Sequence, residues 1–513
     1  MFSLSTKFLV RLHVGIMTAL LAIGFGFPAS TAETSSDPKR TASETIDQNA
    51  EQIATVGDVL YYFGEPGMQE HESSKYLKET LEGAGFKVEL GGAGMPTNVW
   101  ATWGSGNPVI AIVTEMDALP EGSQTPGSIP RKPLVDGAPG HMEGHNVMAA
   151  VAVGAAHAVK KTMEQHKIPG TIVVSIGPAE EQLMSRPYLV RDGYFKNVDA
   201  AVLTHIGDSS ATGYGLQNYA LIGAKFTFKG RTAHGGVNPW DGKDAVDAVV
   251  LMDIGFDKLR EHLRPTYRGH RTITNGGVQP NIIPDSGQIW WFVRDATGPW
   301  AKENFDKLVN IGRGAALMTD TTMEMEPFGA AWPSLGNKAI AEAIQKNIEI
   351  AGVPKWTEEE HKFARELQKS LNKKEEGLAT KVAPLSASRQ NSSSNDIGDI
   401  TWVVPSATVR FPSAVPGVQA HHWTAGIAPT MSIAHKGALV GAKVMAASVL
   451  DLLTSPELLA AAKKQFEQDT KDTKYFSLLP PGAKPPVDLN KDIMDRYRTA
   501  MSKFYLNKKA QFK

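Results

Sequence analysis

Cysteine is absent from the chain of 513 residues. The protein therefore has no disulfide framework, and any metal site must be built from histidine, aspartate and glutamate. A surplus of one charge is absent too, because 53 basic residues stand against 54 acidic ones. Since no long basic run occurs either, the composition gives no reason to expect a nucleic-acid partner.

Long apolar runs are missing beyond the N-terminus. That terminus combines Lys7 and Arg11 with an apolar stretch over 14–27 and small residues up to Ala32, the pattern of a secretory signal peptide. We therefore expect a periplasmic or secreted protein with no membrane contact after cleavage; an uncleaved anchor is the alternative. No later segment reads as apolar enough to span a bilayer. The polar residues 33–45 read as a flexible leader.

The length of the chain predicts two domains. Apolar runs at 109–113, 171–176 and 200–203 are typical of buried strands, and helical patterns such as 146–161 alternate with them. This order predicts an α/β domain with a mostly parallel sheet. After Gly215 the strands alternate polar and apolar residues, which predicts an inserted ferredoxin-like α+β block.

The densest group of candidate ligands is the run 140–146, Gly-His-Met-Glu-Gly-His-Asn. Imidazole and carboxylate together suit Zn²⁺ or Mn²⁺. Glu180 and Glu181 follow the strand 171–176, and ligands gather at the carboxyl ends of strands in such sheets. Two adjacent carboxylates can divide their roles, one binding a metal and the other moving a proton. A solvated pair at a helix start is the alternative.

Three further polar residues stand at comparable positions. His205 ends the third strand, His421 lies in a loop, and Asp117 follows the strand 109–113, where it could orient a ligand histidine. Ordinary hydrogen bonding explains each of these residues alone. Their recurrence at successive strand ends indicates one shared site.

At these motifs the chain resembles the metal-dependent amidohydrolases and carboxypeptidases related to aminoacylase and bacterial carboxypeptidase G. The matching stretches are 117–120, 140–146, 178–181, 231–234, 274–277, 280–284 and 399–402. The resemblance implies hydrolysis of the amide bond of an N-acyl amino acid with two divalent ions, Mn²⁺ or Zn²⁺. It also implies a homodimer formed through an inserted lid, with a related second subunit as a further partner.

The resemblance also assigns roles to residues. The implied metal ligands are Glu143, His145, Glu181, His205 and His421. Glu180 would be the base that activates a metal-bound water, and Asp117 would be a further catalytic residue. His234 would reach the site of the adjoining subunit and stabilise an oxyanion, while Asn281 and Arg294 would hold the substrate.

Glu143 is a departure from the family pattern, which has Gly-Cys-Gly-His at this point. The family's cysteine bridges the two metals, and a carboxylate can also bridge through its two oxygens. Because oxygen is harder than sulfur, the exchange should favour Mn²⁺ or another hard ion. His141 and Glu115 are the fallback ligands if Glu143 does not reach.

The resulting organisation is a signal peptide, a metal-binding catalytic domain in two parts, an inserted lid and a tail. Its boundaries are 1–32 for the signal peptide, 33–218 and 334–455 for the catalytic domain, 219–333 for the lid and 456–513 for the tail. The charged stretch 355–378 predicts a surface helix.

Two other functions stay open at this stage. A dipeptidase or aminoacylase of different specificity would share the site, and the lid tryptophans Trp240, Trp290 and Trp291 could favour aromatic acyl groups or simply fill the lid core or a dimer interface. A non-catalytic exported binding protein would explain the missing cysteine, but binding alone needs no base at Glu180.

Overall fold

The computed structural model describes residues 37–513. The predicted signal peptide and its cleavage position lie outside the described residues. The described chain begins at once with helix α1 (Pro38–Gln48), whose Asp37 caps it and whose Ile46 is buried. The flexible leader expected over 33–45 is therefore wrong for its second half, because Lys39 also pairs with Asp451 of a distant helix.

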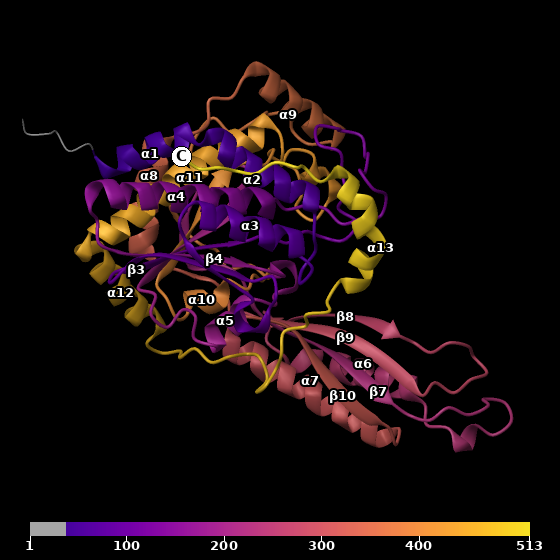
Figure 1. Ribbon diagram of the computed structural model, residues 1–513. Helices are drawn as coiled ribbons and strands as arrows, with labels where there is room; N and C mark the ends of the chain where they lie inside the picture. Colours follow the sequence, from indigo (N-terminus) through magenta and orange to yellow (C-terminus); the bar gives the residue numbers. More distant parts are fainter. Residues whose placement is uncertain (1–36) are drawn as a thin grey trace, which may run out of the picture. The chain divides into compact units, whose positions relative to one another are not determined.

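A six-stranded sheet forms the centre of the fold (Figure 1). Its strands, in spatial order, are β1 (Lys87–Leu90), β2 (Val99–Ser105), β4 (Gly170–Gly177), β3 (Val109–Glu115), β5 (Ala200–Gly207) and β13 (Ser406–Pro412). Strands β4, β3, β5 and β13 pair in parallel, whereas β2 runs antiparallel to both of its neighbours. The mostly parallel α/β sheet predicted from the sequence is confirmed.

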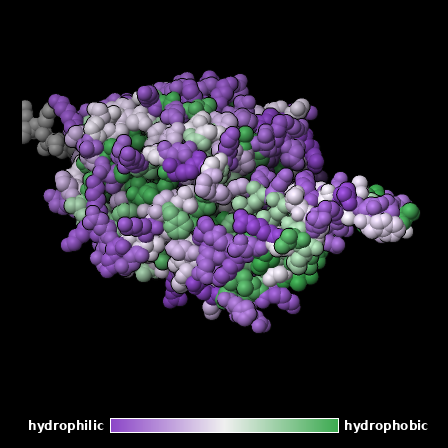
Figure 2. Space-filling view, turned by 90° about the horizontal axis from the view of Figure 1, so that it is seen from below, coloured by the Kyte–Doolittle hydropathy of each residue, from purple (hydrophilic) through white to green (hydrophobic). Residues whose placement is uncertain are grey.

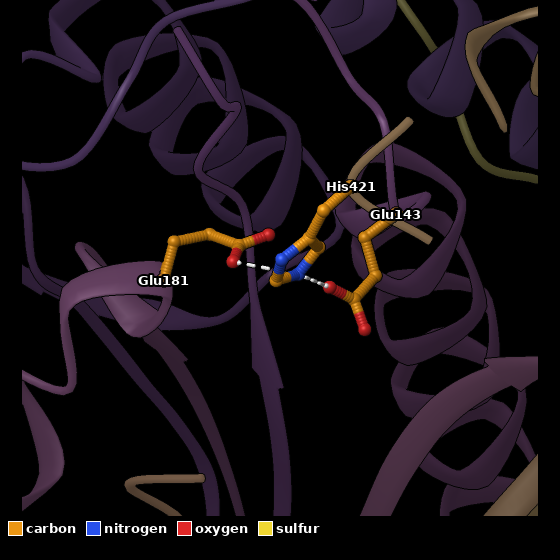
Figure 3. Close-up of side chains that lie close together, drawn as sticks. All are labelled: Glu143, Glu181 and His421. Atoms are coloured by element: carbon orange, nitrogen blue, oxygen red, sulfur yellow. Dashed lines mark hydrogen bonds and ion pairs between the residues drawn. The ribbon is translucent and has the colours of Figure 1, made fainter. Parts of the chain in front are cut away.

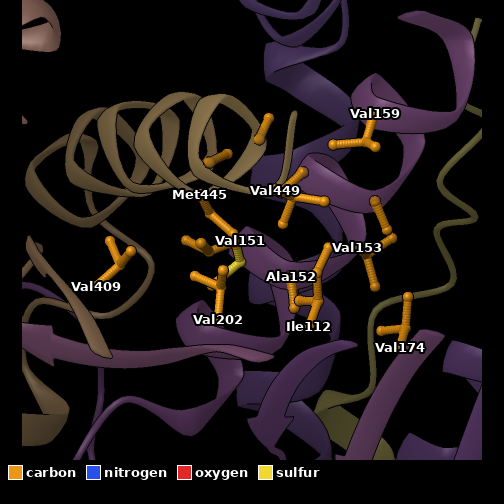
Figure 4. Close-up of a cluster of buried hydrophobic side chains, with 14 of the residues drawn as sticks. Ile112, Val151, Ala152, Val153, Val159, Val174, Val202, Val409, Met445 and Val449 are labelled. Atoms are coloured by element: carbon orange, nitrogen blue, oxygen red, sulfur yellow. The ribbon is translucent and has the colours of Figure 1, made fainter. Parts of the chain in front are cut away.

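Helices cover both faces of this sheet, because its central strands are apolar on both sides. Ile110 and Ile112 face a core shared with α4 and α11 (Figure 4). The alternate residues Ala111 and Val113 face a second core. Besides α1, the α-helices outside residues 220–331 are α2 (Ala50–Phe63), α3 (His71–Gly83), α4 (His145–His166), α5 (Arg186–Arg191), α8 (Lys338–Ala351), α9 (Glu358–Ser370), α10 (Gly398–Thr401), α11 (Ser432–Thr454), α12 (Pro456–Thr470) and α13 (Lys491–Met501). A small sheet joins β6 (Gly213–Leu216), β11 (Leu335–Gly336) and β12 (Ser386–Ala387).

Helix α11 corrects one expectation from the sequence. Among the described residues it is the one helix that is long and apolar enough, by length and composition, to cross a membrane. Most of its apolar window, 67%, is buried inside the protein. Its contacts with α4, α8 and β13 are those of a core helix.

A second, fully antiparallel sheet is inserted between β5 and β13. Its strands are β7 (Ala220–Lys229), β8 (Arg268–Asn275), β9 (Ser286–Asp295) and β10 (Thr322–Ala331), in the spatial order β10-β7-β9-β8. Helices α6 (Ala245–Leu259) and α7 (Gly298–Met318) pack on it, so the chain order is β-α-β-β-α-β, the ferredoxin-like pattern. We call residues 220–331 the insert.

The C-terminal segment is held to the body along its length. Tyr475 donates to Asp399, and the Trp332 indole donates to the Phe476 carbonyl. At the far end, the Lys513 carbonyl lies 2.7 Å from His157 Nε2, and the backbone N–H of Lys513 donates to Asn49. The last residues therefore close the fold over α1, α2 and α4.

Asp399 gives this fold a dependence on pH. Its carboxylate accepts hydrogen bonds from Trp332 N–H at 3.0 Å and from the Tyr475 hydroxyl at 2.7 Å. Burial nevertheless raises the pKa of Asp399 from 3.8 to about 7. Because the pKa of Asp399 is higher in the folded state than in the unfolded state, protonation of Asp399 stabilises the fold. The contribution of Asp399 to stability is complete below about pH 4 and is lost as the pH rises through 7.

Asp399→Asn should therefore raise the melting temperature relative to wild type at pH 8 and change it little at pH 5. The amide can still accept from Trp332 and donate to Tyr475, so the difference isolates the charge. Melting curves of both proteins from pH 5 to 8 measure it, with the exposed Asp472→Asn as control. A melting difference that does not vary with pH would contradict the assignment.

Candidate metal centre

The candidate ligands come from four chain segments that meet at the carboxyl edge of the parallel strands. Glu143 and His145 stand at the start of α4, and His205 lies in β5. Glu181 lies in the short turn after β4, and His421 lies in the loop that follows β13. Parallel strands bring their following loops to one edge, which is why residues so far apart in sequence converge.

Two glycines make the loop 140–146 possible. Gly144 has a φ of 106°, and a Cβ there would lie 2.5 Å from Ile206 Cδ1. A Cβ on Gly140 would lie 2.6 Å from the Gly122 carbonyl oxygen. Only glycine fits at both points, so the loop can pass close to β5 and present Glu143 and His145 together.

Glu143 is the centre of one group of ligand atoms (Figure 3). Its Oε2 lies 2.6 Å from His421 Nε2, and its Oε1 lies 3.3 Å from His205 Nε2. Nε2 of His421 is also 3.1 Å from Glu181 Oε2. The two imidazoles hold the pKa of Glu143 well below its usual range, although burial opposes the shift. Glu143 therefore contacts two of the candidate ligand histidines at once.

His145 belongs to a second group, with Glu180 and Glu181. Its Nδ1 lies 3.1 Å from the Asp117 carboxylate, while its Nε2 is buried without a hydrogen-bond partner. The nearest acid to that Nε2 is Glu180, whose Oε2 is 3.8 Å away. Asp117 thus fixes the tautomer and leaves a lone pair on Nε2 directed into the site, as in carboxylate–histidine–metal triads.

The donor set fits divalent cations. The two groups of possible ligands, Glu143-Glu181-His421 and His145-Glu180-Glu181, share Glu181. Three carboxylates and three imidazoles gather at one edge, a donor set that suits a divalent cation, and the orphaned His145 Nε2 offers a ready ligand atom. Asp117 joins both groups, since it also accepts the Glu181 backbone N–H at 3.1 Å.

Glu180 differs from its neighbour in environment. Burial and the adjacent Glu181 charge raise the pKa of Glu180 well above its ordinary value. A carboxylate with a raised pKa accepts a proton more readily near neutral pH, as a general base requires. Glu181 instead contacts His421, so the two acids have separate partners.

The two fallback ligands belong to neither ligand group and have other hydrogen-bond or ion-pair partners. His141 is buried against Leu60, whose carbonyl is 3.2 Å from its Nε2, and burial lowers its pKa to about 3. Glu115 Oε2 is 2.6 Å from the Arg186 guanidinium. The buried Arg186 also pairs with Asp396, and sequence reasoning missed this ion triad because its members are far apart in the chain.

A cavity of about 340 Å³ opens beside the ligands. We call it the polar cavity, because Asn218, Ser394, Arg294 and Arg410 line it together with Glu143, Glu180, Glu181, His205 and His421. Of the predicted substrate residues it contains Arg294, whose Nε donates to Ser394. Sequence reasoning missed Arg410, which sits at the exposed position of the otherwise buried strand β13.

His234 and Asn281 lie elsewhere. Both are exposed in the loops at the end of the insert, where β-bridge pairing joins His234 to Ile282. The His234 ring accepts backbone N–H bonds from Gly236 and Val237. Neither residue lines the polar cavity of its own chain.

Comparison with known proteins agrees with this geometry. Residues 111–509 match the peptidase family M20/M25/M40. One of the subunits of the Escherichia coli p-aminobenzoyl-glutamate hydrolase is 32% identical over 473 residues, which cover 87% of this chain and 98% of that protein. The mouse Xaa-Arg dipeptidase is 27% identical over 446 residues, covering 84% and 92%.

A solved structure shares the fold. The Bacillus subtilis YXEP protein, described as a dinuclear metal binding peptidase, superimposes with a TM-score of 0.51 at 17% identity, covering 79% of this chain and 99% of that one. The family match spans most of the chain and takes in every candidate ligand. The protein therefore belongs to peptidase family M20/M25/M40 and is a metal-dependent hydrolase of amide bonds.

Proposed function

We propose that the protein hydrolyses the amide bond of an N-acyl amino acid of the p-aminobenzoyl-glutamate type, with a pair of divalent cations bound by Glu143, His145, Glu181, His205 and His421. The observation that carries the proposal is the buried Glu180 carboxylate beside two groups of ligand atoms that share Glu181. The similarity to the E. coli protein, which extends over nearly all of its length, supports the substrate class.

The protein's own residues would handle the proton. Bound cations at such a site lower the pKa of water and polarise a carbonyl group. Glu180 would accept the proton as water attacks the amide carbon, and would then pass it to the leaving amine. Asp117 would keep His145 in the required tautomer throughout, because it accepts from Nδ1–H.

The charge of the polar cavity favours an anionic amino-acid part. Arg294 and Arg410 both line it, and within residues 37–513 neither guanidinium has a carboxylate partner at ion-pair distance. A substrate carboxylate would supply that partner for Arg294. The same two charges disfavour an arginine side chain there, so the alternative activity of an Xaa-Arg dipeptidase is the weaker candidate despite the mouse relative.

We infer that a second copy of the chain completes the site. His234 and Asn281 are exposed in loops of the insert, beside the exposed side chains Val237, Trp240 and Val278. Figure 2 shows these loops as a projection with hydrophobic atoms at its end. Apolar groups exposed on a projection are typical of a contact surface. A homodimer through the insert would cover them and carry His234 to the partner's cavity, where it would stabilise the oxyanion.

Two further points follow from the sequence alone. The proposed signal peptide would export the protein to the periplasm or outside the cell. Glu143 in place of a thiolate would shift metal preference towards Mn²⁺ over Zn²⁺, since harder ions prefer oxygen ligands.

Glu180→Gln should retain the bound metal and lose at least about 100-fold in kcat, because the amide cannot accept the proton. Hydrolysis of p-aminobenzoyl-glutamate and elemental analysis of the same preparation measure the two effects. Near-normal turnover in this variant would show that another group acts as the base.

Glu143→Ala should bind about one ion fewer per protomer, because both His205 and His421 lose their shared acidic neighbour. Glu143→Cys should keep full occupancy and shift competition between equal Mn²⁺ and Zn²⁺ towards Zn²⁺. Elemental analysis after dialysis against both ions provides the readout. Unchanged stoichiometry in Glu143→Ala would exclude Glu143 as a ligand.

Mixing His234→Ala with Glu180→Gln should restore activity if His234 acts on the partner protomer. Random dimers would regain about a quarter of the wild-type rate, since half are mixed and each mixed dimer has one intact site. Each variant alone should be nearly inactive. No recovery after protomer exchange, verified by sizing and labelling, would place His234 in its own protomer's site or outside catalysis.

A further inference from the structure

A second cavity of about 320 Å³ is lined in part by two of the candidate ligands, Glu143 and His205. Most of its wall is apolar, and we call it the apolar chamber; the apolar residues lining it are Ile206, Leu367, Ala414, Val415, Val418, Ala420, Ala425, Ala428 and Pro429. Glu143, His205 and Arg410 line both this chamber and the polar cavity. The two spaces therefore meet at the metal centre.

The wall of the chamber is a built element. Helix α9 begins with a capping box between Thr357 and Glu360, and Glu360 also pairs with Lys436 at 2.8 Å. Leu367 of α9 packs in a separate small core with Val415. Because hydrogen bonds and packing hold this wall from several directions, the chamber is a fixed feature of the fold.

Helix α9 contributes Leu367 to the wall of the chamber, which its charged sequence did not predict. The charged stretch 355–378 predicts a surface helix, and the helix is shorter, at Glu358–Ser370. Its inner face carries Ala364 and Leu367, which are fully buried, and Gln368, which donates to the Gly377 and Pro416 carbonyls. That inner face closes one side of the chamber.

The position of Glu180 decides how a substrate must lie. Glu180 lines the polar cavity and does not line the apolar chamber. Since Glu180 would pass a proton to the leaving amine, the amine part must occupy the polar cavity, where Arg294 stands. The acyl part, on the other side of the same carbonyl, must then extend past Glu143 into the apolar chamber.

Arg410 borders both spaces. It pairs in register with His205 on the neighbouring strand, and its Nη1 lies 3.1 Å from His205 Nδ1. No carboxylate of the described chain pairs with it, although it is exposed to both cavities. A planar guanidinium without an acidic partner, at the mouth of an apolar space, is suited to stack on an aromatic ring.

We propose that the apolar chamber binds the acyl group of the substrate, that this group is a single planar aromatic ring, and that Arg410 stacks on it as a specificity-determining residue. The proposal rests on the amide-hydrolase function proposed above. The volume suits one ring, because 320 Å³ is at the small end of the range for ligand pockets.

The test fills the chamber and compares two substrates with the same amine part. Ala425→Phe places a ring in the chamber, and the exposed Ala461→Phe on α12 is the matched control. The ratio of kcat/KM for p-aminobenzoyl-glutamate to kcat/KM for N-acetyl-glutamate should fall at least about tenfold in Ala425→Phe and not in the control. Melting curves show that both variants are folded.

Arg410 is tested by two replacements in the same assay. Arg410→Met keeps the length of the side chain but removes the guanidinium, and Arg410→Lys keeps the charge without the flat surface. Both should raise KM for the aromatic substrate several-fold more than for the acetyl substrate. Full rescue by lysine, or an equal effect on both substrates, would overturn the stacking role.

Binding of p-aminobenzoate to holoenzyme carrying Glu180→Gln, followed by calorimetry, separates this proposal from the chemical one. Adding Ala425→Phe should weaken that binding at least about tenfold. If wild type hydrolyses neither substrate while this loss of binding occurs, the chamber stands and the proposed reaction fails. If hydrolysis proceeds but the ratio and the affinity both stay unchanged, the chamber is not the acyl site.

Discussion

The carboxylate of Asp117 holds the two halves of the metal centre in place. One of its oxygens accepts from His145 Nδ1–H, and the other accepts from the backbone N–H of Glu181. Because His145 and Glu181 come from different segments, this buried acid sets their separation and directs the free His145 Nε2 into the site. Without this constraint, the acids around the centre would repel each other with nothing to orient their ligand atoms.

Glu143 is the acid that brings the candidate ligand histidines together. It reaches both His205 and His421 across a loop that only glycine at 140 and 144 permits. Glu181, which belongs to both ligand groups, shares the central position with it.

Two cavities border the candidate metal centre. The polar cavity carries Glu180 and Arg294, and the apolar chamber is closed by α9. Arg410 and His205, paired across neighbouring strands, form the boundary between the two. The insert contributes Arg294 to this arrangement, whereas its outer loops carry the exposed His234.

The sequence by itself determined the parallel sheet and the loops that carry the acids and imidazoles. Apolar strand patterns and the Gly-His-Met-Glu-Gly-His run are local signals, and local backbone rules suffice to place Glu143 and His145 in a loop before a helix and Glu180 and Glu181 after a strand. Two expectations from the sequence were nevertheless wrong. The start of the described chain is helical rather than a flexible leader, because distant partners such as Asp451 hold it. Helix α9 is shorter than its charged stretch predicts.

Only the tertiary structure decided which of these residues meet. Arg186 pairs with Glu115, the Leu60 carbonyl lies beside His141, and strand register sets Arg410 beside His205. The apolar chamber depends on packing between α9 and the segment after β13. Each of these relations joins residues far apart in the chain, and periodicity and motif spacing carry no information about such contacts because they are set by burial and strand pairing in three dimensions.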